Sequence, residues 1–262
     1  MRGFDDIKLL PVNLVDDYEK SLPVDLQSAF MSIPESNAEF TSFDYYLASS
    51  STYSSNIEGN TLDFDTYLKN KEFGFSIKQK ETEEIEDLIQ AYEFAQENPL
   101  TLKNVLAAHN IYTRRIITNP KERGQLRRTK VGIRSGGEMI YLAIEPEFLE
   151  NELDQLFRDI RELRHMEITI EETFFFASML HLRFVNIHPF VDGNGRATRL
   201  IEKWFLASKL GRKAWNIESE KYYFNHRPEY YKNLALGGNY YVTNYDLSLP
   251  FLLMLPNSLK KK

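Results

Sequence analysis

The fold of this chain is decided by one stretch, His188-Pro189-Phe190-Val191-Asp192-Gly193-Asn194-Gly195-Arg196-Ala197-Thr198-Arg199. Its two glycines let the backbone turn N–H groups inward, and the apolar spacing that follows predicts the start of a helix. That spacing is carried by Leu200, Ile201, Trp204 and Phe205. A helix that begins in a glycine-rich turn offers unpaired N–H groups and a positive dipole end to an anion. The stretch therefore predicts a nucleotide-phosphate site at a helix N-terminus.

Two arginines lie in the first turn of this predicted helix. Arg196 and Arg199 are three residues apart, so they share one face. Cations at this end oppose the helix dipole and cost about 0.3–1 kcal/mol each unless an anion is present. Two cations at positions that the helix dipole disfavours indicate a binding site.

The same stretch resembles the Fic motif, HxFx(D/E)GNGRxxR, at every defined position. Fic proteins mostly transfer AMP from ATP to a hydroxyl of a target protein. The resemblance implies that His188 is the general base for an attacking Ser, Thr or Tyr hydroxyl. It also implies that Asp192 holds Mg²⁺ between the α- and β-phosphates. Phe190 is expected to be an apolar anchor that fixes the loop in the core.

The other motif residues are implied to bind ATP. Gly193, Asn194 and Gly195 would line an anion hole, while Arg196 and Arg199 would clamp the β- and γ-phosphates. The resemblance therefore implies ATP as the substrate and Mg²⁺ as the cofactor.

The stretch fits neither of two common metal sites. A calcium-binding EF-hand loop counted from Asp192 would put Arg196 and Lys203 at ligand positions, which excludes it. A zinc site on His181 and His188 is disfavoured, because the chain has neither cysteine nor an HExxH pair. A glycine turn with incidental charges stays an alternative.

A second motif, Ser54-Ser55-Asn56-Ile57-Glu58-Gly59-Asn60, lies far upstream. Helical spacing leads into it, with Gly59 as the C-terminal cap, and places Ser54 and Glu58 on one face. The spaced residues are Phe40, Phe43, Leu47, Ser50, Ser54 and Ile57. The motif resembles the Fic inhibitory motif, (S/T)xxxE(G/N). That resemblance implies that Glu58 pairs with Arg199 in place of the γ-phosphate and leaves ATP misaligned. A solvated Glu58 at a helix end is the alternative.

A third element, Val131 to Tyr141, alternates apolar and other residues around Gly136-Gly137, which predicts a hairpin. It resembles the flap that Fic proteins fold over the nucleotide. The resemblance implies ATP contacts from Val131, Gly132 and Ile133. A target segment could add to its edge as a strand. Leu142-Ala143 departs from the prolines of many relatives, and a purely structural hairpin stays an alternative.

Further positions allow two interpretations. Arg227-Pro228-Glu229-Tyr230-Tyr231 resembles the RxxYY segment of the adenine pocket, so Tyr230 could stack on adenine or simply pack. His181 has a family-like position, but a hydrogen-bonded core histidine is the favoured interpretation. Thr169 and Glu172 predict a capping box for the helix that leads to His188, and Pro189 should end it. Helical spacing also marks residues 81–96.

Composition narrows the class of protein. With 42% hydrophobic residues, no cysteine and no apolar run of membrane length, the chain is expected to be cytoplasmic, without disulfides, thiol catalysis or a membrane partner. The net charge of −6 argues against a nucleic-acid partner. The basic stretch Lys121–Arg134 could collect ATP, although a solvated basic face is the favoured interpretation.

These signals predict an all-α Fic-type helical bundle with one short β-hairpin flap and an N-terminal inhibitory helix. The expected regions are 1–100, helical with the inhibitory motif, 101–255, the Fic catalytic domain, and 256–262, a basic tail. The leading function is adenylylation of a protein hydroxyl, restrained by Glu58. The alternatives are removal of AMP from a modified protein using Glu58, or a non-catalytic nucleotide-binding interaction module. Self-modification and a homodimer are both compatible with the sequence.

Overall fold

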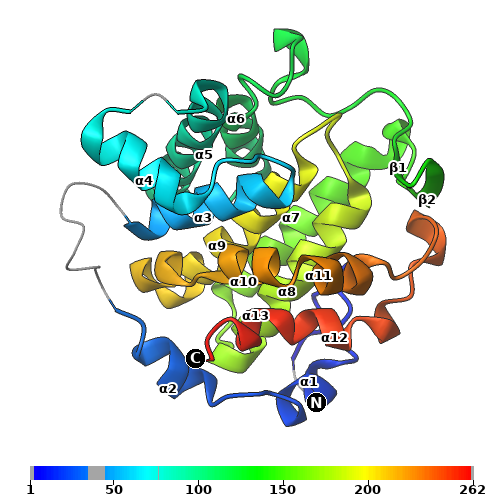
Figure 1. Cartoon of the computed structure of the whole chain (residues 1–262). Coiled ribbons are helices and arrows are strands. Elements are labelled where there is room, and N and C mark those ends of the chain that lie inside the picture. The colour runs from blue at the N-terminus through cyan, green and yellow to red at the C-terminus, as the bar shows by residue number, and fades with distance from the viewer. Residues whose placement is uncertain (1–2, 35–44, 76, 261–262) are drawn as a thin grey trace.

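The computed structural model describes residues 3–34, 45–75 and 77–260, which form helices and one hairpin (Figure 1). The α-helices are α1 (Val15–Lys20), α2 (Leu26–Met31), α3 (Tyr45–Ile57), α4 (Phe64–Phe73), α5 (Gln79–Glu97), α6 (Leu102–Tyr112), α7 (Leu149–His165), α8 (Ile170–Ile187), α9 (Asn194–Leu210), α10 (Ser219–Asn225), α11 (Arg227–Leu234), α12 (Leu249–Leu252) and α13 (Met254–Asn257). Short 3₁₀ turns are η1 (Pro120–Glu122), η2 (Pro146–Phe148), η3 (Arg212–Asn216), η4 (Tyr240–Val242) and η5 (Tyr245–Leu247). The strands are β1 (Gly132–Ser135) and β2 (Glu138–Leu142). The predicted all-α fold with one hairpin is confirmed.

Helix α8 lies at the centre of the molecule. It packs against α1, α2, α9, α12 and α13, and Phe174, Phe175 and Phe176 are all fully buried, as expected for a helix that is apolar on every side. The predicted capping box starts it. Thr169 Oγ1 accepts a hydrogen bond from the Glu172 N–H (3.1 Å), and the Glu172 carboxylate accepts one from the Thr169 N–H (2.9 Å).

A short loop joins the C-terminus of α8 to the N-terminus of α9. Helix α8 ends at Ile187, because Pro189 disfavours the right-handed helical conformation in the residue before it, and the C-cap His188 has a left-handed backbone (φ 52°, ψ 59°). Helix α9 starts after Gly193, which is also left-handed (φ 80°). Since α9 packs along α8, both ends of the loop are fixed by the core.

Helix α3 is buried although it is polar. It packs against α5, α9 and α10, and its buried residues include five serines, Ser49, Ser50, Ser51, Ser54 and Ser55. Small side chains allow close approach to the neighbouring helices. Phe40 and Phe43, predicted to start this helix, lie outside the described residues. Helix α5 agrees with the helix predicted over 81–96 and extends it slightly at both ends.

The larger apolar core contains residues from Phe4 to Leu255, on both sides of position 100, and a smaller cluster contains Ala48, Leu62, Tyr67 and Ile85. The predicted boundary at residue 100 therefore does not separate two folding units, and it stays a prediction about function. At the start of the predicted tail, Pro256 is buried and Leu259 packs on the core. Residues 261–262 lie outside the described residues. Within the part of the chain described, no helix is both long and apolar enough to cross a membrane.

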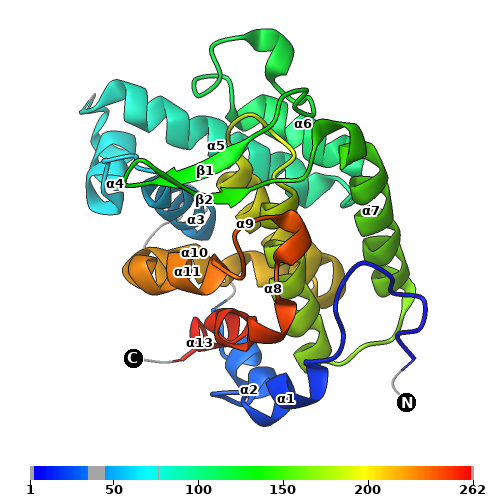
Figure 2. The same cartoon turned by 90° about the vertical axis from the view of Figure 1, so that its right-hand side faces the viewer.

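The hairpin is antiparallel and turns at Gly136-Gly137, as predicted. Figure 2 shows its two strands side by side at the surface. Leu142 at the end of β2 donates its N–H to Gly238 O (3.0 Å) and forms a parallel bridge with Asn239. The end of β2 is thus joined to the segment before η4.

Candidate functional site

His188 has the protonation state that a base requires. Its Nδ1 lies 3.1 Å from Val185 O, and a carbonyl only accepts, so Nδ1 carries the hydrogen and Nε2 keeps a free lone pair. Burial lowers the pKa of His188, and its bond to Val185, which raises the pKa, only partly offsets this effect. The ring is therefore neutral near pH 7 and can accept a proton at Nε2.

The loop after His188 is closed by its own side chains. Asn194 Oδ1 accepts from the Phe190 N–H, and Asn194 Nδ2 donates to Phe190 O, both at 2.9 Å. Phe190 is fully buried and stacks on His109 with ring centroids 3.7 Å apart, which confirms its role as a core anchor. The Asn194 side chain is used in this closure, so an anion would meet main-chain N–H groups of the first α9 turn.

Glu58 and Arg199 are brought together from distant parts of the chain. Arg199 Nη2 lies 2.8 Å from Glu58 Oε1, and the same guanidinium donates to Ser54 Oγ (2.9 Å) and Ser54 O (3.0 Å). The expected pairing of Glu58 with Arg199 is thus present, and Ser54 lies on the same face. The Arg199 side chain is 1% exposed and that of Glu58 is 28% exposed, so the pair is shielded on one side only.

Charge keeps this pair ionised. Burial raises the pKa of the Glu58 carboxyl, but the positive charges of Arg199 and Arg196 outweigh that effect, and the pKa lies below its ordinary value. Burial lowers the pKa of Arg199, whereas Tyr230 and Glu58 more than reverse this and raise it. Glu58 therefore remains a carboxylate at every pH near neutrality.

Gly195 provides the space for the Glu58 carboxylate. A β-carbon at position 195 would lie 2.9 Å from Glu58 Cδ, nearer still to Oε1, and 3.2 Å from Arg199 Nη1. The Glu58 carboxylate therefore lies directly against the first turn of α9, where an anion is favoured by the helix dipole.

Arg196 has a different carboxylate partner. It is 5% exposed and pairs with Glu84 of α5, not with Glu58. Its Nε is buried and has no hydrogen-bond acceptor among the described residues. The two predicted phosphate-binding arginines are thus held by carboxylates from two different parts of the fold.

Asp192 is exposed at the mouth of the loop, and its Oδ1 accepts the Gly193 N–H at 2.6 Å. The described residues include no group of three or more His, Cys, Asp or Glu side chains suited to a metal. A metal held here would take most of its ligands from phosphates and water. Mg²⁺ is commonly bound in that way, so one exposed carboxylate fits it.

Tyr230 and His181 are packed in the core beside Arg199. Tyr230 is 1% exposed, its hydroxyl lies 3.3 Å from Arg199 Nη1, and its ring stacks on Tyr223 at 5.0 Å. This agrees with packing rather than with stacking on adenine. His181 is fully buried between the Glu202 carboxylate (2.7 Å) and the Tyr230 hydroxyl (2.9 Å), which confirms the core histidine.

The flap residues Val131, Gly132 and Ile133 are partly exposed, and Ile133 also packs against the apolar core. Hydrogen bonds connect the base of the flap with the C-terminal end of α8. Ala143 donates its N–H to Val131 O (3.1 Å), and the Tyr141 hydroxyl donates to Asn186 O (2.8 Å) in the last turn of α8.

Arg127 was not singled out by its sequence, and the structure gives it a central place. It is 3% exposed and donates to His188 O (2.7 Å), Thr129 O (2.8 Å) and Ile144 O (2.5 Å). This corrects the picture of a uniformly solvated basic face, because Arg127 is buried while several of its basic neighbours are exposed. Those exposed side chains are Lys121, Arg128, Lys130 and Arg134.

His109 likewise belongs to no motif that would mark it in the sequence. Gly124 donates its N–H to His109 Nδ1 (2.8 Å), so the hydrogen lies on Nε2, which donates to Asp192 O (3.0 Å). Burial lowers the pKa of His109 to about 4, which keeps this pattern intact near neutral pH. The position of His109 within a helix does not indicate from the sequence that its side chain bonds the loop at Asp192.

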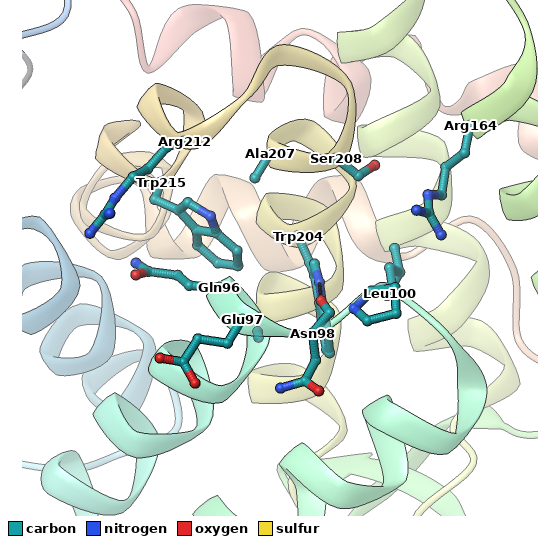
Figure 3. Close-up of a pocket in the computed structure, with 12 residues that line it drawn as sticks. Gln96, Glu97, Asn98, Leu100, Arg164, Trp204, Ala207, Ser208, Arg212 and Trp215 are labelled. Carbon is teal, nitrogen blue, oxygen red and sulfur yellow. Dashed lines mark hydrogen bonds between the residues drawn. The ribbon is translucent and has the colours of Figure 1, made fainter.

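A separate hollow of about 370 Å³ lies away from this loop (Figure 3). Its lining includes Trp204, Trp215, Arg164 and Arg212. Trp204 lies ten residues into α9, which is about 15 Å along the helix from its N-terminus. The hollow therefore belongs to the far end of α9 and takes no part in the arrangement around His188.

These features define an all-α protein in which a histidine and a glycine loop join two core helices beneath a hairpin. Residues 99–206 match the Fic/DOC family. A protein adenylyltransferase Fic from Culex quinquefasciatus is 27% identical over 204 residues, covering 71% of this chain and 36% of the relative. Its counterpart from Drosophila erecta is 30% identical over 164 residues, covering 59% and 31%. The chain thus spans about a third of the length of these curated relatives.

Solved structures share the fold. A Fic family protein from Desulfovibrio desulfuricans G20 has a TM-score of 0.71 at 18% identity, covering 95% of this chain and 72% of that one. A Fic domain-containing signaling protein from Bacteroides thetaiotaomicron has a TM-score of 0.65 at 21% identity, covering 89% and 92%. Residues 99–206 thus form a Fic/DOC domain, as the motif at His188 to Arg199 also indicates, and the solved Fic structures share the fold of this chain.

Proposed function

We propose that this protein transfers AMP from ATP to a hydroxyl side chain of a target protein, and that Glu58 restrains the reaction. The observation that carries the proposal is the neutral His188, which precedes the loop leading into α9 and whose Nε2 has no hydrogen-bond partner among the described residues. Its relatives from Culex and Drosophila bear the name protein adenylyltransferase, which supports the same reaction.

In this reaction the target hydroxyl oxygen attacks the α-phosphorus of ATP. Its proton passes to His188 Nε2, the bond between the α-phosphorus and the oxygen bridging to the β-phosphate breaks, and pyrophosphate leaves. Main-chain N–H groups of Asn194 and Gly195, with Arg196 and Arg199, would hold the phosphate charge. When bound, Mg²⁺ would neutralise phosphate charge, and Asp192 is the residue that would hold it.

Glu58 is the restraint in this proposal. Its carboxylate lies against Gly195 and occupies Arg199, so a γ-phosphate would have to displace it to reach the same guanidinium. The pair is partly exposed, so it is held by a modest free energy that a nucleotide or a partner can overcome.

A second reaction is favoured by the way Glu58 uses its oxygens. Only Oε1 takes part in the described bond to Arg199, so Oε2 could orient a water molecule. The water would attack the phosphorus of an AMP-modified side chain, and AMP would be released with the hydroxyl restored. The third candidate, a nucleotide-binding interaction module, requires that Glu58 never leaves Arg199.

One experiment separates these candidates. Wild-type and Glu58→Gly proteins are incubated with ATP labelled at the α-phosphate and with lysate proteins, and separately with AMP-modified proteins. Transfer increased by Glu58→Gly supports adenylylation, and release of AMP lost on that change supports the reverse enzyme. ATP binding without either reaction supports the module and would overturn the proposal. Mass spectrometry of the labelled proteins identifies the target and the modified residue.

A further inference from the structure

The two arginines of the first α9 turn are held in different ways. Arg199 is paired with Glu58, whose carboxylate lies over Gly195. Arg196 is paired with Glu84, which comes from α5. The atoms nearest to a β-carbon built on Gly195 belong to Glu58 and Arg199, not to Glu84. Glu84 and Glu58 therefore hold different arginines of the same helical turn.

Arg196 is only partly satisfied by this contact. Its side chain is 7% exposed, Nη2 contacts Glu84 Oε1, and the buried Nε has no acceptor among the described residues. A buried donor left without an acceptor costs about 1–3 kcal/mol. A phosphate oxygen that met this N–H would remove that cost, whereas one competing for Nη2 would have to displace Glu84.

We propose that Glu84 is a positioning residue that fixes the guanidinium of Arg196 so that its free N–H groups meet the phosphates of ATP. A carboxylate behind a ligand-binding group limits its rotation, and an arginine fork held in one orientation loses less entropy on binding phosphate. The inference rests on the phosphate site proposed above. It assigns opposite effects to two glutamates, since Glu58 excludes the phosphate and Glu84 prepares its site.

The neighbouring carboxylates on α5 have other partners. Glu83 pairs with Arg115 (2.8 Å), and Asp87 pairs with the same arginine (2.6 Å). Glu86 pairs with Lys71 (3.0 Å). Of these acidic residues, Glu84 alone forms a salt bridge to α9 within the described residues, and Glu83 provides a matched control on the same helical turn.

The test measures affinities for ATP, AMP and inorganic triphosphate by calorimetry, in Glu58→Gly protein so that Arg199 is free. Glu84→Ala should weaken ATP and triphosphate binding by about tenfold, the worth of one charge-assisted hydrogen bond. It should leave AMP binding nearly unchanged, because AMP has no β- or γ-phosphate. Glu84→Gln keeps an oxygen acceptor and should retain most of the ATP affinity. Glu83→Ala should change none of these values.

The outcomes that contradict the inference are distinct. Tighter ATP binding in both Glu84→Ala and Glu84→Gln would show that Glu84 competes with phosphate. Equal losses for ATP and AMP would show a general structural role. Unchanged ATP affinity in Glu84→Ala, or no polyphosphate binding by Glu58→Gly protein, would also overturn it. Phosphate binding with the expected pattern but no AMP transfer would leave the inference standing and defeat the proposed reaction.

Discussion

The carboxylate of Glu58 lies against Gly195 so closely that no side chain fits between them. A β-carbon on Gly195 would lie within 2.9 Å of Glu58 Cδ. The requirement for glycine at this position is thus steric, because Gly195 is helical and its φ is not in the left-handed region.

Gly195→Ala should therefore destabilise the wild-type protein by about 1–2 kcal/mol, through strain or loss of the Glu58–Arg199 pair. In Glu58→Gly protein the same change should be neutral or slightly stabilising, since alanine favours a helix over glycine by about 0.5–1 kcal/mol. Urea unfolding of the four proteins gives the double-mutant cycle. Equal effects of Gly195→Ala in both backgrounds would contradict the contact.

Glu58→Gly should raise AMP transfer by about 10- to 100-fold, the range expected when a partly buried ion pair no longer competes with the γ-phosphate. The increase should be absent in Arg199→Ala protein, because the same guanidinium is needed to seat ATP. Initial rates with labelled ATP measure both changes. An unchanged rate for Glu58→Gly alone would mean that residues 54–60 are an ordinary helix end.

His188→Ala in Glu58→Gly protein should reduce transfer by about 10²–10⁴-fold and leave ATP affinity largely intact, because a base acts in the transition state. The pKa of His188 is lowered by burial, so the active neutral ring should persist below the ordinary histidine range. The rate with His188 present should therefore decline only at a pH below about 6.5. Near-full transfer by His188→Ala would exclude this residue as the base.

Asp192→Ala should remove both AMP transfer and its dependence on Mg²⁺, since Asp192 supplies the exposed carboxylate in the loop. Rates measured over a range of Mg²⁺ concentrations test this in Glu58→Gly protein. Asp192→Asn is the matched variant that keeps the shape and an oxygen ligand. Full rescue of Asp192→Ala by ordinary Mg²⁺ concentrations would mean that another residue holds the metal.

His109 should make the protein sensitive to acid. Its pKa of about 4 in the folded protein is below the unfolded value of about 6.5, so the unfolded chain binds a proton first as the pH falls. Its contribution is complete above about pH 6.5 and should decrease by about 2 kcal/mol by pH 5. Unfolding at pH 7 and 5 measures this loss, which His109→Gln should lack. His165→Gln removes an exposed histidine as a control, and an equal effect there would exclude His109 as the cause.

The sequence predicted the elements whose determinants are local. The capping box at Thr169, the turn at Gly136-Gly137 and the break at Pro189 each depend on residues a few positions apart, and all are confirmed. The motif spacing also placed Glu58 opposite Arg199, but only through resemblance to a family.

The sequence did not predict the contacts made by residues far apart in the chain. Glu84 looks like one more charge on an acidic helix, and only packing of α5 on α9 directs it to Arg196. The burial of α3 was equally hidden, because its serines lack the apolar character expected of a core helix. Tyr230 allowed two interpretations until its surroundings were known.

Arg127 connects the proposed base, His188, with the hairpin that the proposed target would contact. Its guanidinium donates hydrogen bonds to the carbonyl oxygen of His188 and to those of Thr129 and Ile144, which lie on either side of the hairpin. If a target segment adds to the hairpin as a strand in the proposed reaction, these bonds would hold it at a fixed distance from the imidazole, whatever its side chains. Alignment of acceptor and base would then depend on the scaffold, and changes on the hairpin surface would alter the target without changing the residues around His188.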